Sequence, residues 1–114
     1  MAIDYSKQIG KKITTKGSQK TCIHTESIVY IQCEGNFVTL FINDNNKVQE
    51  IKTLKKYEED LSGIGFIRIS KNTIINGKYV TKISTSIDKR IVYLGEIALK
   101  ISKRRLSYLK KQLC

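Results

Sequence analysis

Apolar residues, most of them β-branched or aromatic, gather in short segments along the first half of the chain, with polar residues between them. The intervening residues are typical of turns, as at Gly17-Ser18, Glu34-Gly35-Asn36 and Asn43-Asp44-Asn45-Asn46. This pattern predicts a meander of antiparallel hairpins. The predicted strands are Lys11–Thr15, Lys20–Thr25, Ile28–Cys33, Phe37–Ile42 and Lys47–Lys52.

The period of the pattern changes at Thr53. Leu54, Tyr57 and Leu61 fall on one side of a 3.6-residue repeat, whereas the charged residues between them point elsewhere. Thr53 is suited to cap the amino end of a helix, and Ser62-Gly63 is suited to end it. Because two acidic residues lie near the negative end of the helix dipole, we expect this helix to depend on docking its apolar face.

The second half of the chain returns to β-type segments and ends in a basic helix. Leu106, Leu109 and Leu113 fall on one face of that helix, and Ser102 is a natural cap for it. A length of 114 residues leaves room for one core of ordinary size. We therefore expect an N-terminal extension over residues 1–10 and one mainly β domain over residues 11–114. Its later strands are predicted at Phe66–Ile69, Thr73–Ile75, Tyr79–Ser84, Arg90–Leu94 and Ile97–Ile101.

The charge of the chain is strongly positive, with 21 lysine and arginine residues against 10 acidic ones and a formal net charge of +11. Such a field attracts polyanions, so nucleic acid, an anionic membrane surface and acidic protein are the candidate partners. The longest stretches without a charged residue, such as Phe37–Asn43, are too short to span a bilayer. The amino-terminal residues have no apolar core that would act as a secretion signal. We expect a cytoplasmic protein.

Residues that would carry catalysis or hold a metal are sparse. His24 is the only histidine, and it lies in a predicted strand. Cys22, Cys33 and Cys114 are widely spaced and form no CxxC pair, which predicts free thiols instead of a disulfide framework or a zinc site. We expect Cys33 to be buried in its strand. Gly63-Ile64-Gly65 lacks the further residues of a phosphate loop. The sequence therefore predicts no enzyme, no metal, no cofactor and no small-molecule substrate.

Basic residues concentrate in two places. The segment from Lys100 to Lys111 holds six of them and no acid, so it alone can neutralise several phosphates. A second group surrounds the Ser70-Lys71-Asn72 segment, and it consists of Arg68, Lys71, Lys78 and Lys82. The serine and asparagine residues among them are short hydrogen-bonding side chains suited to contact bases or phosphates from the tip of a loop. This arrangement favours nucleic acid among the candidate partners.

Four motifs in the same order resemble those of LytTR DNA-binding domains: IVYIQCEGNFVTLF, LKKYEEDL, FIRISKNTIINGKYVTKI and LKISKRRLSYLKKQL. The resemblance covers roughly Lys11 to Leu113. It implies an all-β fold of several short antiparallel sheets side by side, with one short mid-chain helix and a short C-terminal helix. It also implies the output domain of a bacterial response regulator that controls transcription, reading DNA sequence with loops between strands, on paired or repeated sites and as a homodimer on DNA.

Carried over by position, the resemblance places the DNA contacts in three segments. They are the turn that contains Asn36, the segment Ser70-Lys71-Asn72, and Lys103-Arg104-Arg105, with Lys78 as a further candidate. Lys71 is expected to face a base edge, and whether Lys103 or Arg104 is the main contact stays open. The hypothesis requires Lys71 and the Lys103–Arg105 cluster to emerge on the same side of the molecule, where one duplex can touch both.

Three residues near these segments have structural interpretations. Glu34 lies beside the first turn, where it would repel phosphate. Asn76 is expected at a left-handed or turn position before Gly77. Arg68 is expected to stack under the sheet or to pair with an acid such as Glu58.

Two alternative functions stay open from the sequence. The first is a non-specific RNA-binding or ribosome-associated β module, which would stack bases on exposed aromatic residues. The second is a basic protein-interaction or membrane-surface module that uses the C-terminal helix. The aromatic residues that the first alternative requires are Tyr30, Phe37, Tyr79 and Tyr93.

Overall fold

A computed structural model describes residues 12–14, 22–43, 45–86 and 88–113. Ten strands, two α-helices and three short 3₁₀ helices lie within these ranges. The expected N-terminal extension and Cys114 lie outside the described residues. In chain order the elements are β1 (Lys12–Thr14), β2 (Cys22–His24), η2 (Thr25–Ser27), β3 (Ile28–Glu34), β4 (Phe37–Ile42), β5 (Asn46–Glu50), α1 (Leu54–Asp60), β6 (Phe66–Ser70), β7 (Thr73–Asn76), η3 (Gly77–Tyr79), β8 (Lys82–Ser86), β9 (Lys89–Leu94), β10 (Ile97–Lys100), η4 (Lys103–Arg105) and α2 (Leu106–Leu113).

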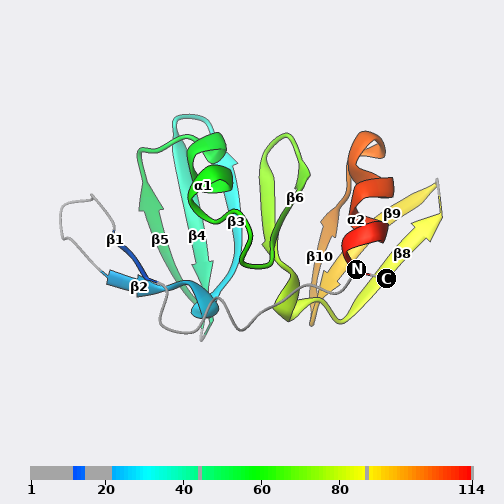
Figure 1. The fold of residues 1–114 in the computed structure, drawn as a ribbon, viewed down its shortest axis with the longest axis horizontal. Helices are drawn as coiled ribbons and strands as arrows, with labels where there is room; N and C mark the ends of the chain where they lie inside the picture. Colours follow the sequence, from blue (N-terminus) through cyan, green and yellow to red (C-terminus); the bar gives the residue numbers. More distant parts are fainter. Residues whose placement is uncertain (1–11, 15–21, 44, 87, 114) are drawn as a thin grey trace.

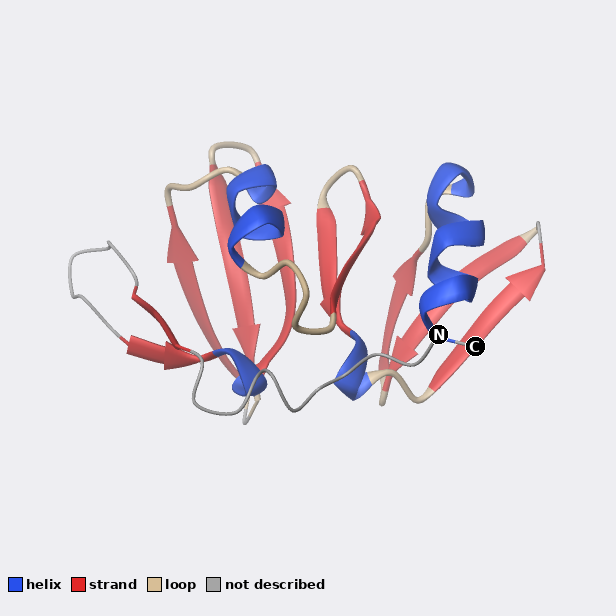
Figure 2. Cartoon of the chain, viewed as in Figure 1, coloured by secondary structure: helices blue, strands red, loops and turns tan. Residues whose placement is uncertain are grey.

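The strands form three antiparallel sheets that lie side by side (Figures 1 and 2). The central sheet has five strands in the order β5-β4-β3-β7-β6, flanked by the two-stranded sheet β1-β2 and the three-stranded sheet β10-β9-β8. The two α-helices are short, and each lies in front of a sheet in the view of Figure 1. The predicted all-β fold of short antiparallel sheets is therefore confirmed. None of the helices in the described ranges has the length and apolar character needed to cross a membrane.

Instead of the one core expected from the length, two apolar cores hold the sheets and helices together. The first gathers buried residues of β3, β4 and α1, including Ile31, Leu40 and Tyr57. The second gathers residues of β6, β9 and α2, including Ile69 and Leu109. Both α-helices dock through the apolar faces that the sequence predicted, since burial of such faces is the main source of stability for short helices.

The β6–β7 hairpin belongs to both cores. Successive side chains of a strand point to opposite faces, and on β7 this sends Ile74 into the first core and Ile75 into the second. Both side chains are almost completely buried, with 1% and 0% of their surface exposed. The hairpin therefore packs against apolar residues on both of its faces, and these contacts fix the position of the turn at its tip.

Most element boundaries agree with the sequence pattern. Thr53 caps α1 as predicted, because its Oγ1 accepts a hydrogen bond from the backbone N–H of Lys56 at 3.2 Å. Ser102 does occupy the cap position before η4, but its side chain makes no capping hydrogen bond. Instead, the Ser102 carbonyl accepts from the N–H of Arg105 at 3.1 Å. The C-terminal helix therefore begins with a 3₁₀ turn and needs no hydroxyl cap.

The predicted strand Tyr79–Ser84 is partly wrong. Tyr79 ends the 3₁₀ helix η3, and its hydroxyl donates to the carbonyl of Glu26 at 2.6 Å, so the following strand begins only at Lys82. Asn76 starts η3 from an extended conformation, with φ of −91°, and not from a left-handed one. Its buried side chain accepts a hydrogen bond from the N–H of Lys78. Asn76 therefore caps the helical turn Gly77–Tyr79, which lies where the predicted strand would have begun.

Candidate nucleic-acid interface

The turn between β6 and β7 carries three of the residues predicted to contact DNA. Lys71 and Asn72 are exposed, whereas Ser70 is half-buried. Ser70 Oγ donates to Asn72 Oδ1 at 2.8 Å, and Thr73 Oγ1 donates to the same oxygen at 3.0 Å. The hydroxyl of Ser70 thus supports the shape of the turn. Lys71 and the amide group of Asn72 are what the turn presents to solvent.

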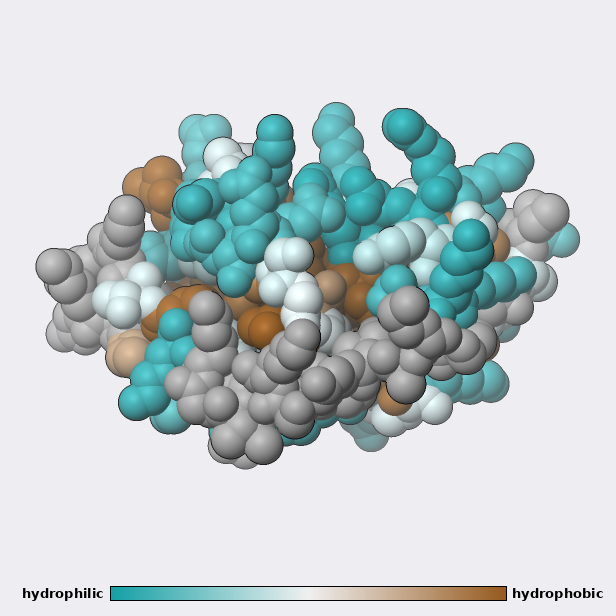
Figure 3. Space-filling view, in the orientation of Figure 1, coloured by the Kyte–Doolittle hydropathy of each residue, from teal (hydrophilic) through white to brown (hydrophobic). Residues whose placement is uncertain are grey.

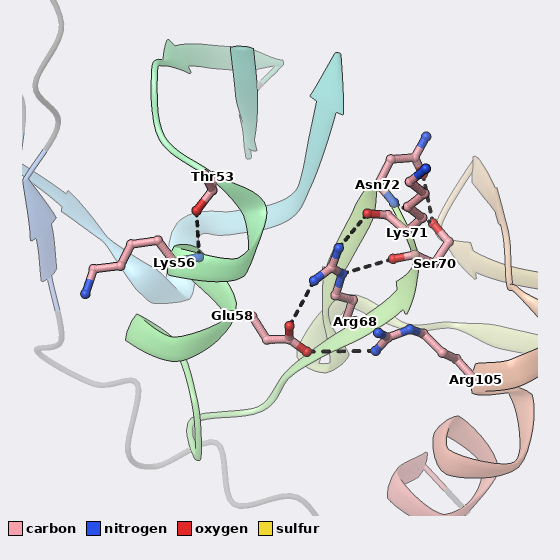
Figure 4. Close-up of polar contacts among 8 residues, drawn as sticks. All are labelled: Thr53, Lys56, Glu58, Arg68, Ser70, Lys71, Asn72 and Arg105. Carbon is pink, nitrogen blue, oxygen red and sulfur yellow. Dashed lines mark hydrogen bonds and ion pairs between the residues drawn. The ribbon is translucent and has the colours of Figure 1, made fainter. Parts of the chain in front are cut away.

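Arg68 lies beneath this turn, as Figure 4 shows. Its Nε donates to the carbonyl of Ser70 at 3.1 Å, and its Nη2 donates to the carbonyl of Lys71 at 2.6 Å. Its Nη1 lies 3.0 Å from Glu58 Oε1 on α1. The expected pairing of Arg68 with Glu58 is therefore confirmed, and the same guanidinium also binds the backbone of the turn.

The third predicted segment, η4, is joined directly to the β6–β7 hairpin. The N–H of Ser102 donates to the carbonyl of Ile69 at 2.8 Å. The first two residues of η4 are exposed, whereas Arg105 is half-buried and places its Nη1 3.8 Å from Glu58 Oε2. Glu58 therefore faces two arginines, one from each of the two basic segments that the sequence singled out.

A groove of about 520 Å³ lies where the β6–β7 turn faces η4 and α2. Its walls bring Lys71 together with the C-terminal basic cluster on one surface, as the DNA hypothesis requires. A second groove, of about 470 Å³, lies between the same turn and β10 and includes Lys100 in its wall. The first groove is lined by Arg68, Lys71, Ser102, Arg104, Arg105 and Tyr108.

The turn that contains Asn36 lies at the same edge of the molecule. It connects β3 to β4, and Gly35 adopts a left-handed conformation there with φ of +61°. The strand before it is tied to the β6–β7 turn, because the N–H of Cys33 donates to the carbonyl of Asn72 at 2.8 Å. Asn36 is exposed, and so is Glu34 beside it. Figure 1 shows the β3–β4 turn, the β6–β7 turn and the start of the C-terminal helical segment along one edge.

Lys78 is not brought to this edge. It lies on η3, which follows β7 directly, so the whole length of that strand separates it from the turn at Lys71. Its Nζ lies 5.8 Å from the centre of the Tyr79 ring. The sequence placed Lys78 with the others because it is near them in the chain, whereas an antiparallel hairpin sends consecutive strand ends to opposite edges.

The acidic residues of α1 near this edge are paired with cations. Lys52 Nζ lies 2.7 Å from Asp60 Oδ2, and Lys56 Nζ lies 3.4 Å from Asp60 Oδ1. The hydrogen bond from Lys52 is the main cause that holds the pKa of Asp60 below its ordinary value. Glu58 faces two arginines as well, so Asp60 and Glu58 each neutralise one positive charge locally, while exposed Lys71, Lys103 and Arg104 keep this edge cationic. Hydrophilic side chains crowd the upper edge of the molecule in Figure 3, above α1, the β6–β7 hairpin and α2.

One residue of this surface, Tyr108, and one contact, that of Glu58 with Arg105, were not identified from the sequence. Tyr108 has 53% of its surface exposed and lines the groove beside Arg104 and Arg105. Its position between Leu106 and Leu109, off the apolar face of the helix, was a signal that could have revealed its exposure. Glu58 had no such signal as a partner of Arg105, because 47 positions in the chain separate them.

The aromatic residues required by the RNA alternative do not form a common exposed face. Tyr30 is half-buried and stacks on Phe41, with ring centroids 4.1 Å apart, and burial raises its pKa. The Tyr79 hydroxyl is held by the backbone of Glu26. Phe37 is 48% exposed at the β3–β4 turn. Stacking of successive bases needs several rings on one surface. Tyr30, Phe41 and Tyr79 line one groove of about 500 Å³, whereas Phe37 lies at the opposite end of β4, so the named rings do not all share one surface.

The described residues contain no group of three or more histidine, cysteine and acidic side chains placed to hold a metal ion. His24 is exposed on β2, in the strand where the sequence placed it. Cys22 and Cys33 are free thiols. The expectation that Cys33 is buried was wrong: it is half-buried, with Sγ 3.7 Å from the carbonyl of Gly35, because the turn that follows leaves this end of β3 open to solvent.

The fold and this cationic edge define a mainly β DNA-binding domain. The LytTr DNA-binding domain family matches residues 18–114, and the chain belongs to that family. A solved structure from Bacillus cereus, described as the LytTr DNA-binding domain of a methyl-accepting/DNA response regulator, has a TM-score of 0.77 and 17% sequence identity. The match covers 90% of this chain and 96% of that one, which shows a shared fold. No curated protein matches the sequence.

Proposed function

We propose that this domain binds specific sequences of double-stranded DNA and serves as the output domain of a response regulator that controls transcription in the bacterial cytoplasm. The observation that carries the proposal is the placement of exposed Lys71 in the same groove as Arg104 and Arg105. One duplex can therefore touch a loop tip and a cationic cluster at once. The Bacillus cereus neighbour, whose description names a response regulator, supports the regulatory role.

In this proposal phosphate contacts supply most of the affinity. Lys103, Arg104, Lys110 and Lys111 are exposed on η4 and α2, where they can follow a sugar-phosphate backbone. Each phosphate neutralised releases condensed counterions, so binding weakens steeply with salt. If about five phosphates are neutralised, the slope of log K against log salt concentration should be about −4 to −5.

Two loop tips supply the discrimination between sequences. Lys71 and Asn72 on the β6–β7 turn are suited to base edges in a major groove, with lysine favouring the O6 and N7 atoms of guanine. Asn36 on the β3–β4 turn lies at the same edge and is assigned to the neighbouring part of the site. The proposal includes two copies of the domain on paired or repeated sites, since a single domain with short loops covers only a few base pairs.

The experiment begins with selection of bound fragments from random duplex DNA, which tests whether any sequence is preferred. Affinity for the selected duplex is then compared with affinity for a scrambled duplex, for single strands, for structured RNA and for anionic vesicles at one salt concentration. Equal binding to RNA, or vesicles that displace all bound DNA without sequence preference, would favour the alternative functions.

Two variants, Lys71→Ala and Lys110→Ala, distinguish sequence-specific base contacts from phosphate contacts. Lys71→Ala should cost about 1 to 3 kcal/mol on the selected duplex and relax preference at one or two base pairs. Lys110→Ala should weaken all duplexes alike, because a phosphate contact carries no sequence information. Equal losses on every sequence for both variants would remove Lys71 from the reading role.

A further inference from the structure

The guanidinium of Arg68 binds two backbone carbonyls and a carboxylate together. The side chain is only 16% exposed, although it belongs to the most basic edge of the protein. Its Nε and Nη2 donate to the carbonyls of Ser70 and Lys71, and its Nη1 meets Glu58 (Figure 4). An arginine whose donors are engaged in this way has little left to offer to a phosphate.

Four consecutive carbonyls of the β6–β7 turn accept hydrogen bonds, the outer two from residues outside the hairpin and the inner two from Arg68 of β6. The carbonyl of Ile69 accepts from the N–H of Ser102, and the carbonyl of Asn72 accepts from the N–H of Cys33. The two carbonyls between them, at the tip itself, accept from Arg68, while the side chains of Ser70 and Thr73 donate to Asn72 within the turn. Arg68 therefore holds the backbone at the part of the turn from which the Lys71 side chain leaves it.

Arginine is suited to this task for a geometric reason. Its planar group carries five N–H donors in a rigid fork, so one side chain can hold two adjacent carbonyls and still pair with a carboxylate. A lysine keeps the charge but has donors on a single atom at the end of a flexible stem. Glu58 neutralises the charge of Arg68 at 3.0 Å, which lets the guanidinium stay under the turn instead of extending into solvent.

We propose that Arg68 is a specificity-determining positioning residue, which holds the Lys71-Asn72 tip in the shape that reads DNA without touching DNA itself. The inference rests on the proposed function, because it assigns the reading role to Lys71. Without Arg68 the tip carbonyls bind water and the turn samples several conformations. Each binding event must then order the turn, and the free energy of this ordering is subtracted from the affinity. Phosphate contacts do not require that order, and binding to non-specific DNA persists.

The test is Arg68→Lys, which keeps the charge and removes the fork. Affinities for the selected duplex and a scrambled duplex are measured at several salt concentrations, together with the midpoint of thermal unfolding. The ratio of specific to non-specific affinity should fall by about tenfold, as expected from loss of about 1.4 kcal/mol of ordering. The salt slope and the affinity for scrambled DNA should stay as in the wild type.

Arg90→Lys is the matched control. Arg90 lies on β9, and its Nε donates to the carbonyl of Ile101 at 3.1 Å outside the turn, so this variant should leave the specificity ratio unchanged. If Arg68→Lys does not fold, Arg68→Gln is used, since glutamine removes the charge and the fork but keeps an amide donor. It should give the same loss of ratio without a change in salt slope.

A double variant tests whether Arg68 acts through Lys71. In a Lys71→Ala background, Arg68→Lys should cause no further loss of the ratio, because the side chain that Arg68 positions is already absent. Additive losses would overturn the proposal. So would a salt slope reduced by about one with equal losses on every sequence, which marks a direct phosphate contact.

A lower unfolding midpoint with an unchanged ratio would likewise overturn it, because Arg68 would then serve stability alone. These outcomes are distinct from failure of the proposed function. A wild-type domain without preference for any duplex contradicts sequence reading itself. A wild-type preference that survives Arg68→Lys contradicts only the positioning role.

Discussion

Asn76→Ala should destabilise the domain strongly without weakening the DNA contact of the molecules that remain folded. Asn76 is completely buried at the end of β7, with 0% of its surface exposed. Its Nδ2 donates to the carbonyl of Ile28 at 2.9 Å, and its Oδ1 accepts from the N–H of Lys78 at 3.1 Å. One side chain thus joins the start of β3 to the start of η3. Alanine removes both hydrogen bonds and leaves a buried carbonyl with one partner fewer.

The magnitude follows from these contacts. Each of the two hydrogen bonds contributes about 1 kcal/mol net, and a buried group left without its partner costs about 1 to 3 kcal/mol more, so we expect a loss of about 3 to 5 kcal/mol. A chain of 114 residues loses roughly 4 °C in Tm for each kcal/mol. The expected fall in Tm is therefore about 12 to 20 °C.

Urea titration followed by circular dichroism measures the loss, and fluorescence anisotropy with labelled duplex measures binding well below the unfolding midpoint. Asn46→Ala is the control, because Asn46 is exposed on the edge strand β5 and a surface change of this kind shifts stability by about 0.5 kcal/mol or less. A variant that keeps wild-type stability but binds the selected duplex tenfold more weakly would refute the reasoning. It would show that Asn76 contacts DNA and does not brace the fold.

Two further predictions concern charge. Glu58→Gln removes the carboxylate that lies 3.0 Å from Arg68 and 3.8 Å from Arg105. Binding to scrambled duplex at low salt should therefore strengthen about two- to fivefold, which is the effect of one charge about 5 to 10 Å from a phosphate in water. Unchanged or weaker binding in anisotropy titrations would contradict this prediction. Burial raises the pKa of Tyr57 from 10.0 to about 12 in the folded protein, with Glu50 and Asp60 adding to the shift. The neutral phenol therefore contributes stability that is present below pH 10 and is lost as pH rises toward about 12. Urea titrations between pH 9 and 12 should show a decline in wild type that is smaller in Tyr57→Phe, and equal declines would argue against it.

Local features of the fold were predictable because they depend on neighbours in the chain. Turn residues such as Gly35 and a period that changes at Thr53 specify strands and a helix without knowledge of the rest of the molecule. The strand predicted from Tyr79 failed because a distant partner, the carbonyl of Glu26, holds the Tyr79 hydroxyl and favours a helical turn. Tertiary contacts of this kind override local propensity.

For the candidate interface, too, the local position of each residue was predictable, whereas the grouping of the residues on one surface was not. The sequence by itself determined that Lys71 lies at a turn tip and that Lys103–Arg105 precede an amphipathic helix, since both follow from local pattern and charge. Only the tertiary structure decided which of these residues share a surface. The alternation of Ile74 and Ile75 between two cores brings the tip beside η4 and leaves Lys78 at the far end of the strand. The pairing of Glu58 with Arg68 and Arg105 joins elements far apart in the chain, and such contacts form only when the sheets pack.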